Sequence, residues 1–240
     1  MARSRDSAGP GGYFALRNVS PGDAAAAPLP HYLRGRLPED RAAPILDIGC
    51  GFGQVLLPLQ RAGYTDLAGI DVSPEAADYL GRFGIPVDRR DVLDVLRDAP
   101  SRRYAFVAMT HVLEHLEKPS IVPALAAIRE KLLRPGGALF VRVPNAQAST
   151  GCYWAYEDFT HSTLFTAGSL SYVLRAAGFA SIEFLDSYDL ELSRFPRRQV
   201  RRALLRLFDL RMRFWNRVTN SAFHAPSPVI YSWELRCLAR

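Results

Sequence analysis

Short apolar runs separated by longer mixed segments dominate residues 45–145 of this 240-residue chain. The run Ile45–Ile48 is apolar apart from one acid and leads directly into a glycine-rich turn, as expected of a buried strand. Comparable runs lie at residues 67–72, 86–92 and 104–110, and a fifth follows a Pro-Gly-Gly turn and ends near residue 145. Strands that alternate with helices in this way predict a parallel, doubly wound α/β sheet.

Capping residues indicate where two of the intervening helices begin and end. Ser73 precedes Pro74, so the serine is expected to cap a helix whose first residue is the proline. Thr166 is expected to cap a helix over residues 167–177, and Gly178 is placed to end it.

The pattern is weaker toward both ends of the chain. Residues 1–44 are interpreted as an N-terminal leader with one short helix at residues 31–37. Residues 181–188 and 229–238 are predicted to form a sixth and a seventh strand. One domain is therefore expected to span residues 45–240, a length that suffices for a full α/β core.

An atypical insertion, residues 190–226, separates these last two strands. Its apolar residues recur at spacings of three and four, which predicts an amphipathic helix. Between residues 194 and 217, nine arginines and one acid give a net charge of +8, whereas the whole chain carries +6. Two interpretations stay open. The helix can contact an anionic membrane surface or lipid carrier, or it can pack on its own domain or on a second subunit of a homodimer.

The remaining composition narrows the class of protein. Because the positive charge belongs to one segment, no general nucleic-acid surface is expected. There is no run of about 18 apolar residues and no apolar segment at the N-terminus, so neither a spanning helix nor a secretory signal is expected. Three widely spaced cysteines, without a C-x-x-C pair, fit a reducing compartment and a cytoplasmic location.

The glycine turn after the first strand is the strongest candidate for a binding site. It has the pattern D-x-G-x-G-x-G, formed by Asp47, Gly49, Gly51 and Gly53, with Cys50 packed inside the turn. Glycine permits a positive φ and lets a ligand approach the backbone closely, and open α/β sheets bind ligands beyond the carboxyl ends of their strands. Asp47 is expected at the rim of this nucleotide site. A dinucleotide fingerprint would need a glycine where Gln54 stands.

Two further acids follow the next two strands. Asp71 comes about 20 residues after the glycine turn, where nucleotide-binding folds place an acid on the ribose hydroxyls. Asp91 ends the third predicted strand. Either acid can instead be a cap of the helix that follows it.

Together with the fourth strand, which ends in Thr110-His111, and the Leu-Arg-Pro-Gly-Gly turn before the fifth, these motifs resemble class I S-adenosylmethionine (SAM)-dependent methyltransferases. The resemblance implies a seven-stranded, mostly parallel sheet with an antiparallel last strand. It also implies that the glycine turn holds the methionine part of SAM, and that Asp91 and the amide of the next residue contact adenine. The implied cofactor contacts are Asp47, Gly49, Cys50, Gly51, Gly53, Asp71, Val72, Asp91, Val92, Thr110 and His111.

A hydroxyl acceptor needs a general base, and histidine suits that role near neutral pH. His161 lies in an Asp-x-x-His segment, Asp158 to His161, that resembles methyltransferases of polysaccharide and lipid-sugar biosynthesis. His161 is therefore the first candidate for the base, and Asp158 for its orienting acid. His115 is a weaker catalytic candidate. Each histidine can instead be structural.

A metal site is the alternative use of the same residues. His111, Glu114 and His115 share a helical face, and His161 would add a third imidazole. Small-RNA 2′-O-methyltransferases and ubiquinone-pathway O-methyltransferases resemble this set but have glutamate at the position of His111. That substitution disfavours Mg²⁺, which prefers oxygen ligands, and no metal is expected.

The leading hypothesis is a SAM-dependent O-methyltransferase that acts on a sugar hydroxyl of a glycan or of its lipid-linked precursor. Methylation of a small phenol or secondary metabolite is the rival reaction. A SAM-binding protein without catalytic activity is the rival from a different class.

Overall fold

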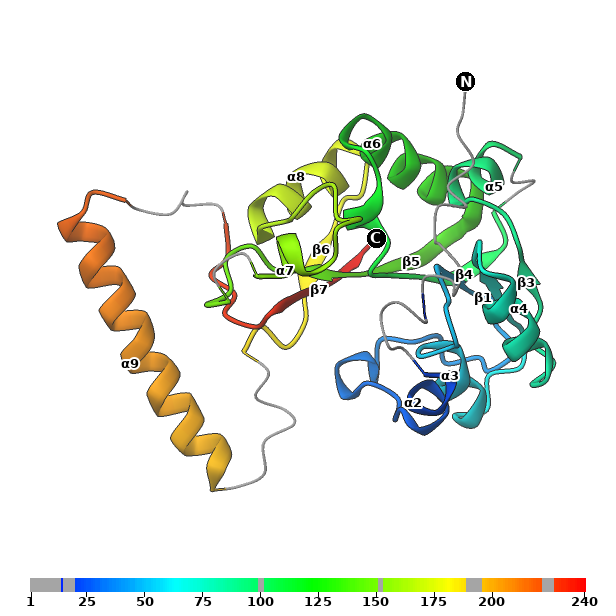
Figure 1. Ribbon diagram of the computed structural model, residues 1–240, viewed down its shortest axis with the longest axis horizontal. Helices are drawn as coiled ribbons and strands as arrows, with labels where there is room; N and C mark the ends of the chain where they lie inside the picture. The colour runs from blue at the N-terminus through cyan, green and yellow to red at the C-terminus, as the bar shows by residue number, and fades with distance from the viewer. Residues whose placement is uncertain (1–13, 15–19, 99–101, 151–152, 189–195, 222–226) are drawn as a thin grey trace.

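The structure, a computed structural model, describes residues 14, 20–98, 102–150, 153–188, 196–221 and 227–240. Its centre is a seven-stranded sheet with the strand order β3-β2-β1-β4-β5-β7-β6 (Figure 1). The strands are β1 Ile45–Ile48, β2 Leu67–Ile70, β3 Val87–Asp88, β4 Tyr104–Thr110, β5 Leu133–Pro144, β6 Ile182–Phe184 and β7 Glu234–Ala239. β1 pairs in parallel with β2 and β4, whereas β7 is antiparallel to β5 and β6. The predicted mostly parallel sheet is confirmed.

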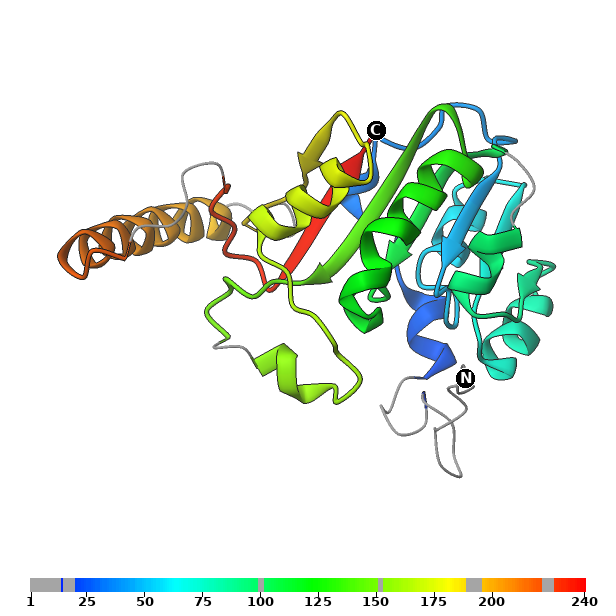
Figure 2. The ribbon, with the colours of Figure 1, turned by 90° about the horizontal axis from the view of Figure 1, so that it is seen from above.

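Helices connect these strands and cover both faces of the sheet. They are α2 Pro21–Ala26, η1 His31–Leu33, α3 Leu56–Arg61, α4 Pro74–Gly81, α5 Val92–Asp98, η2 Leu113–His115, α6 Lys118–Ala127, η3 Ile128–Leu132, α7 Tyr153–Glu157, α8 Ala167–Ala176 and α9 Arg197–Val218. α6 and α8 lie on one face and α2 and α3 on the other (Figures 1 and 2).

Two apolar cores result, one on each face of the sheet. Successive residues of a strand point to opposite faces. Accordingly Met109 of β4 packs in the same core as Leu125 of α6, while Phe106 packs with Leu56 of α3. The central strand β1 is buried along its whole length, as expected of a parallel strand covered on both sides.

The strand order reverses at β1, which lies between β2 and β4. The crevice beyond the carboxyl ends of such a pair is the usual ligand site of an open α/β sheet. Gly49 follows β1 and His111 follows β4, so the fold brings the glycine turn and the start of the histidine segment to this crevice.

Local capping signals predicted helix ends well. The Ser73 side chain accepts from the N–H of Ala76, and Pro74 is the first residue of α4. Thr166 caps α8 by accepting from the N–H of Ser169. Gly178, with a φ of +91°, follows the end of that helix.

Several predicted boundaries are wrong. The helix at residues 31–37 is only the single turn η1, because Arg34 already has extended backbone angles. The third strand stops at Asp88 and does not reach residue 92, because α5 begins there. β6 is shorter than residues 181–188, and β7 begins at Glu234 instead of residue 229.

The predicted helix between β6 and β7 is confirmed as α9. None of its side chains is buried, and it projects away from the sheet (Figures 1 and 2). The ring of Phe208 and the carboxylate of Asp209 both contact Tyr231. The helix thus packs on its own domain along one side, as one of the two interpretations expected, but most of its apolar stripe stays exposed. Among the described residues, no helix combines the length and apolarity that crossing a membrane requires.

Candidate active site

The glycine turn has the backbone that its sequence predicts. Gly49, Gly51 and Gly53 all have positive φ, at +69°, +49° and +85°. At Gly49 a Cβ would also collide with the side chain of Val112, so a larger residue would both strain the turn and displace its neighbour. Among the described residues, the ring of Phe14 also packs against this turn, with its centroid 4.5 Å from that of Phe52.

Asp71 lies directly after β2 and faces this turn. Its Oδ2 accepts from the N–H of Gly51 over 2.8 Å, and its Oδ1 accepts from the N–H of Ser73 over 2.9 Å. Burial raises the pKa of Asp71 above its usual value, although both hydrogen bonds oppose the rise. The next side chain, Val72, is 64% exposed. An acceptor carboxylate beside an exposed apolar side chain fits a ribose and the adenine attached to it.

Asp91 and Val92 lie at the start of α5 and not at the end of a strand. Oδ1 of Asp91 accepts from the N–H of Leu93 over 2.8 Å, so the acid caps this helix. The carboxylate is exposed, whereas the Val92 side chain is buried. Asp91 therefore has the helix-capping role that was one of its two expected roles. That Asp91 and the Val92 amide contact adenine stays a prediction.

Asp47 does not lie at the rim of the site, contrary to expectation. It is 1% exposed in the middle of β1, and its Oδ1 has no hydrogen-bond partner. Burial raises the pKa of Asp47 to about 8; the cation of Arg142 opposes that rise and the charge of Asp71 adds to it. Cys50 is buried as predicted, and burial raises the pKa of its thiol. Both side chains belong to the wall beneath the turn.

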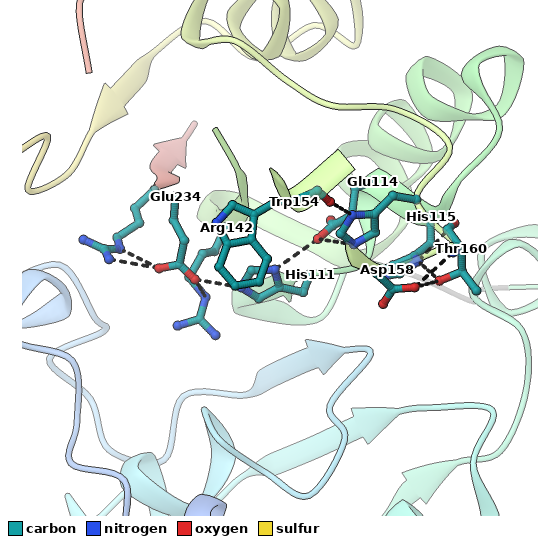
Figure 3. Close-up of polar contacts among 10 residues, drawn as sticks. His111, Glu114, His115, Arg142, Trp154, Asp158, Thr160 and Glu234 are labelled. Atoms are coloured by element: carbon teal, nitrogen blue, oxygen red, sulfur yellow. Dashed lines mark hydrogen bonds and ion pairs between the residues drawn. The ribbon is translucent and has the colours of Figure 1, made fainter. Parts of the chain in front are cut away.

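Thr110 ends β4, and His111 follows it with a φ of +55°, which is unusual for a residue with a side chain. The His111 ring lies between two buried carboxylates (Figure 3). Its Nδ1 is 3.0 Å from Glu114 Oε1 and its Nε2 is 2.7 Å from Glu234 Oε1. Burial opposes protonation, but the two carboxylates raise the pKa of His111 above its usual value. With both nitrogens donating to carboxylates, His111 has no lone pair to act as a base or a metal ligand.

His161 has the opposite arrangement. Its Nδ1 is 2.5 Å from the carbonyl oxygen of Trp154. A carbonyl oxygen only accepts, so Nδ1 carries a proton and Nε2 is the ring nitrogen that can carry a lone pair. Nε2 lies 3.9 Å from Glu114 Oε1. The N–H groups of Ser162 and Thr163 donate to the Glu114 carbonyl and hold this loop against η2.

Asp158 is connected to His115 through Thr160. The Thr160 hydroxyl donates to Asp158 Oδ1 over 2.6 Å and lies 2.9 Å from His115 Nδ1. Since this hydroxyl already donates, Nδ1 of His115 must donate to it, which leaves Nε2 unprotonated. Burial lowers the pKa of His115 and favours the neutral ring. The Asp158 carbonyl also accepts from the N–H of His161. That the Asp158 carboxylate orients the His161 ring stays a prediction.

These side chains form one cluster with metal-ligand chemistry. One ligand atom from each of Glu114, His115 and His161 lies within 4.8 Å of the others. The two imidazole rings, those of His115 and His161, are close, and their centroids are 4.8 Å apart. Oε2 of Glu114 is buried without a hydrogen-bond partner. His111, the fourth ligand considered above, is occupied by its two carboxylates, so a cation here would have three protein ligands at most from that set.

An aromatic wall, defined here as Trp154, Trp233 and His111, borders this cluster. The two indole rings have centroids 4.8 Å apart, and the Trp233 ring stacks on His111 with an interplanar angle of 17°. Trp233 is 36% exposed, and Phe159, on the loop that leads to His161, is fully exposed. Flat apolar surfaces next to a candidate base favour an acceptor that carries a ring.

Sequence reasoning missed several residues of this site. Glu234 is one of the missed residues. His111, Arg142 and Arg236 lower the pKa of its carboxyl to about 2, against the effect of burial. Trp154 and Trp233 were also missed. Glu234 lies in a strand that also contains Arg236, so no distinctive local signal marks it in the sequence, and neither tryptophan lies in a recognisable motif.

Comparisons with known proteins agree with this geometry. A family model described as "Methyltransferase domain" matches residues 7–183. The chain is 30% identical over 154 residues to a ubiquinone biosynthesis O-methyltransferase of Cereibacter sphaeroides, which covers 58% of this chain and 61% of that protein. It is 35% identical over 120 residues to the Xylella fastidiosa protein of the same name, which covers 48% and 46%. The chain thus spans less than two thirds of the length of these relatives.

A solved structure supports the fold over almost the whole chain. It is a SAM-dependent methyltransferase from Archaeoglobus fulgidus, with a TM-score of 0.65 and 21% identity. The alignment covers 95% of this chain and 99% of that one. Because the family model spans most of the chain, the chain belongs to the methyltransferase-domain family, as a class I SAM-dependent methyltransferase.

Proposed function

We propose that this chain is an O-methyltransferase and that His161 is its general base. The observation that carries the proposal is the contact between Nδ1 of His161 and the carbonyl oxygen of Trp154. The Trp154 carbonyl fixes the proton on Nδ1, so a lone pair is available on Nε2 for the proton of an acceptor hydroxyl. The names of the curated relatives, ubiquinone biosynthesis O-methyltransferases, support an oxygen acceptor.

SAM supplies a methyl group already activated by its sulfonium centre, so the protein needs no nucleophile of its own. The glycine turn and Asp71 would hold SAM at the carboxyl ends of β1 and β2. His161 Nε2 would take the hydroxyl proton as the acceptor oxygen bonds to the methyl carbon and the bond from that carbon to the sulfonium sulfur breaks, which would leave neutral S-adenosylhomocysteine. Glu114, whose Oε1 lies 3.9 Å from Nε2, would stabilise the imidazolium that forms.

The aromatic wall favours a phenolic or other ring-bearing acceptor over a sugar. Trp233 offers a partly exposed indole face beside His111, and Phe159 adds an exposed ring on the loop leading to the base. The comparisons give no support to the glycan acceptor suggested by the Asp158–His161 segment. The phenol hypothesis, the rival in the sequence analysis, is therefore the one proposed for the acceptor.

The test is a methyl-transfer assay with methyl-labelled SAM and matched acceptors. A catechol and a methyl glycoside present hydroxyl groups on a flat ring and on a saturated ring. We expect label in the catechol product and none in the glycoside. Transfer to the glycoside alone would refute the acceptor class, and transfer only to nitrogen or sulfur acceptors would refute O-methylation.

A further inference from the structure

The helix α9 exposes an apolar surface that the rest of the described chain does not cover. The helix has 22 residues and none of them is buried. Tyr231 contacts it on one side, through the ring of Phe208 and the carboxylate of Asp209. Figure 2 shows α9 extending past the edge of the sheet.

Helical spacing divides the surface of α9 into three rows. One row, which contains Phe208, Asp209 and Met212, is half-buried and faces Tyr231. A second row consists of residues three, four or seven positions apart, which are apolar except for the exposed Arg211. Its apolar members are each more than half exposed: Val200, Leu204, Leu207, Leu210, Phe214, Trp215 and Val218. The third row consists of Arg202, Arg206, Arg213 and Arg217, all exposed.

The charge of α9 indicates whether the apolar row contacts a second copy of this helix or a lipid surface. The helix contains eight arginines and one acid, Asp209, and Arg213 pairs with that acid over 2.7 Å. A second copy of this helix would bring a second row of arginines beside the first, and like charges at close range repel. An anionic lipid surface has the complementary charge. Arginine side chains can keep their guanidinium groups at the headgroups while their stems and the apolar row face the acyl chains.

We propose that α9 docks on an anionic lipid bilayer, lying in its interface with the apolar row inserted and the arginine row among the lipid phosphates. Trp215 and Phe214 suit this depth, because aromatic side chains favour the boundary between headgroups and acyl chains. The helix is far too polar to cross the bilayer, so the contact is peripheral. The proposal does not depend on which acceptor is methylated.

Sedimentation of the full chain with lipid vesicles tests the proposal. We expect binding to vesicles of phosphatidylcholine mixed with phosphatidylglycerol at low salt, release at high salt, and little binding to phosphatidylcholine alone. This comparison needs no variant. Equal binding to neutral vesicles, or no binding to anionic vesicles at any salt, would overturn the proposal.

Two variants separate the charge from the apolar row. Each basic residue near an anionic surface contributes about 1 kcal/mol, or about fivefold in binding. The triple variant R202E/R206E/R217E should therefore lower the partition coefficient about a hundredfold or more. L207D/F214D should abolish binding while the arginines remain. Both should retain wild-type affinity for S-adenosylhomocysteine, since α9 lies outside the glycine turn.

Matched controls place the same changes elsewhere on the surface. Arg82, Arg134 and Arg175 are exposed and lie outside α9, so R82E/R134E/R175E has the same net charge as the helix variant. Tyr172 of α8 is 72% exposed and provides an apolar control as Tyr172→Asp. We expect Tyr172→Asp to bind like wild type and the charge control to lose far less than the helix variant. Equal loss in both triple variants would show a general charge effect and refute docking through α9.

Measuring the oligomeric state tests whether the apolar row joins two copies of the chain instead. Light scattering should show a monomer in the absence of lipid, both for the wild type and for L207D/F214D. A wild-type dimer that becomes monomeric in L207D/F214D would show that the apolar row joins two copies, and the lipid proposal would be overturned.

Discussion

The backbone N–H of Gly51 donates a hydrogen bond to Oδ2 of Asp71 over 2.8 Å. The second oxygen of the same carboxylate accepts from Ser73, at the start of α4. One side chain therefore joins the turn after β1 to the first turn of the helix after β2. The two segments that would hold the methionine and ribose parts of SAM are thus fixed relative to each other before the cofactor binds.

Replacing Asp71 should weaken the binding of SAM and of S-adenosylhomocysteine alike. Asp71→Asn keeps an oxygen for one N–H but removes the charge that would accept the ribose hydroxyls. A hydrogen bond to a charged group contributes about 1.5–3 kcal/mol, so calorimetry should show affinity reduced by roughly ten- to a hundredfold. Asp66→Asn is the matched control, because that acid pairs with Arg103 at the surface. Unchanged affinity in a folded Asp71→Asn protein would remove Asp71 from the site.

Replacing His161 should affect turnover and not cofactor affinity. Loss of a general base typically lowers the rate by about 10²–10⁴. His161→Ala should therefore lower kcat by this factor while the dissociation constant of S-adenosylhomocysteine stays at its wild-type value. His31→Ala serves as the control, because His31 bonds to Asp186 and lies outside the cluster. Wild-type kcat in His161→Ala would refute the proposed role.

His115 distinguishes a general-base site from a metal site. If His161 acts alone as the base, His115→Ala should reduce kcat only modestly and EDTA should leave the wild type active. We expect this result. A divalent cation held by Glu114, His115 and His161 would make His115→Ala as damaging as His161→Ala. Calorimetric titration with Zn²⁺ or Co²⁺ gives a second readout, and stoichiometric binding lost in Glu114→Gln would establish the metal site instead.

Trp233 should determine acceptor affinity. Trp233→Ala removes the exposed face of the aromatic wall but leaves the Trp154 carbonyl and the His161 tautomer in place. We therefore expect a higher KM for a catechol with kcat nearly unchanged. Trp233→Phe should restore most of the loss, because a ring is retained. A fall in kcat without a change in KM would show that the indole positions the catalytic cluster and does not bind the acceptor.

The backbone of the glycine turn and the position of Asp71, where SAM is proposed to bind, could be predicted from the sequence because their signals are local. Gly49, Gly51 and Asp71 lie within or just after strands, and their conformations depend on a few neighbouring residues. Asp47 was wrongly predicted to lie at the rim of the site, because local signals do not reveal burial. The glycine pattern gives its position along the chain, but its burial follows from β1 lying between β2 and β4 at the centre of the sheet.

The catalytic half depends on contacts between residues far apart in the chain. His111 was correctly placed after β4, yet its state is set by Glu234, 123 residues later. The tautomer of His161 is set by a main-chain carbonyl, a group that every residue has and that no sequence pattern reveals. The exposure of α9 was equally hidden, because a periodic apolar stripe predicts the helix but not what covers it.

Asp47 should make the free energy of unfolding depend on pH in an unusual direction. Burial raises the pKa of Asp47 to about 8 from its ordinary value of 3.8. Between these two values the folded protein keeps a proton that the unfolded chain releases, so the contribution of Asp47 to stability falls as pH rises. Asp47→Asn cannot ionise and escapes this loss. The gain in urea unfolding free energy of Asp47→Asn over the wild type should therefore be larger at pH 8 than at pH 5. A difference that is constant across this range, or that shrinks toward pH 8, would show that Asp47 is already ionised in the folded protein.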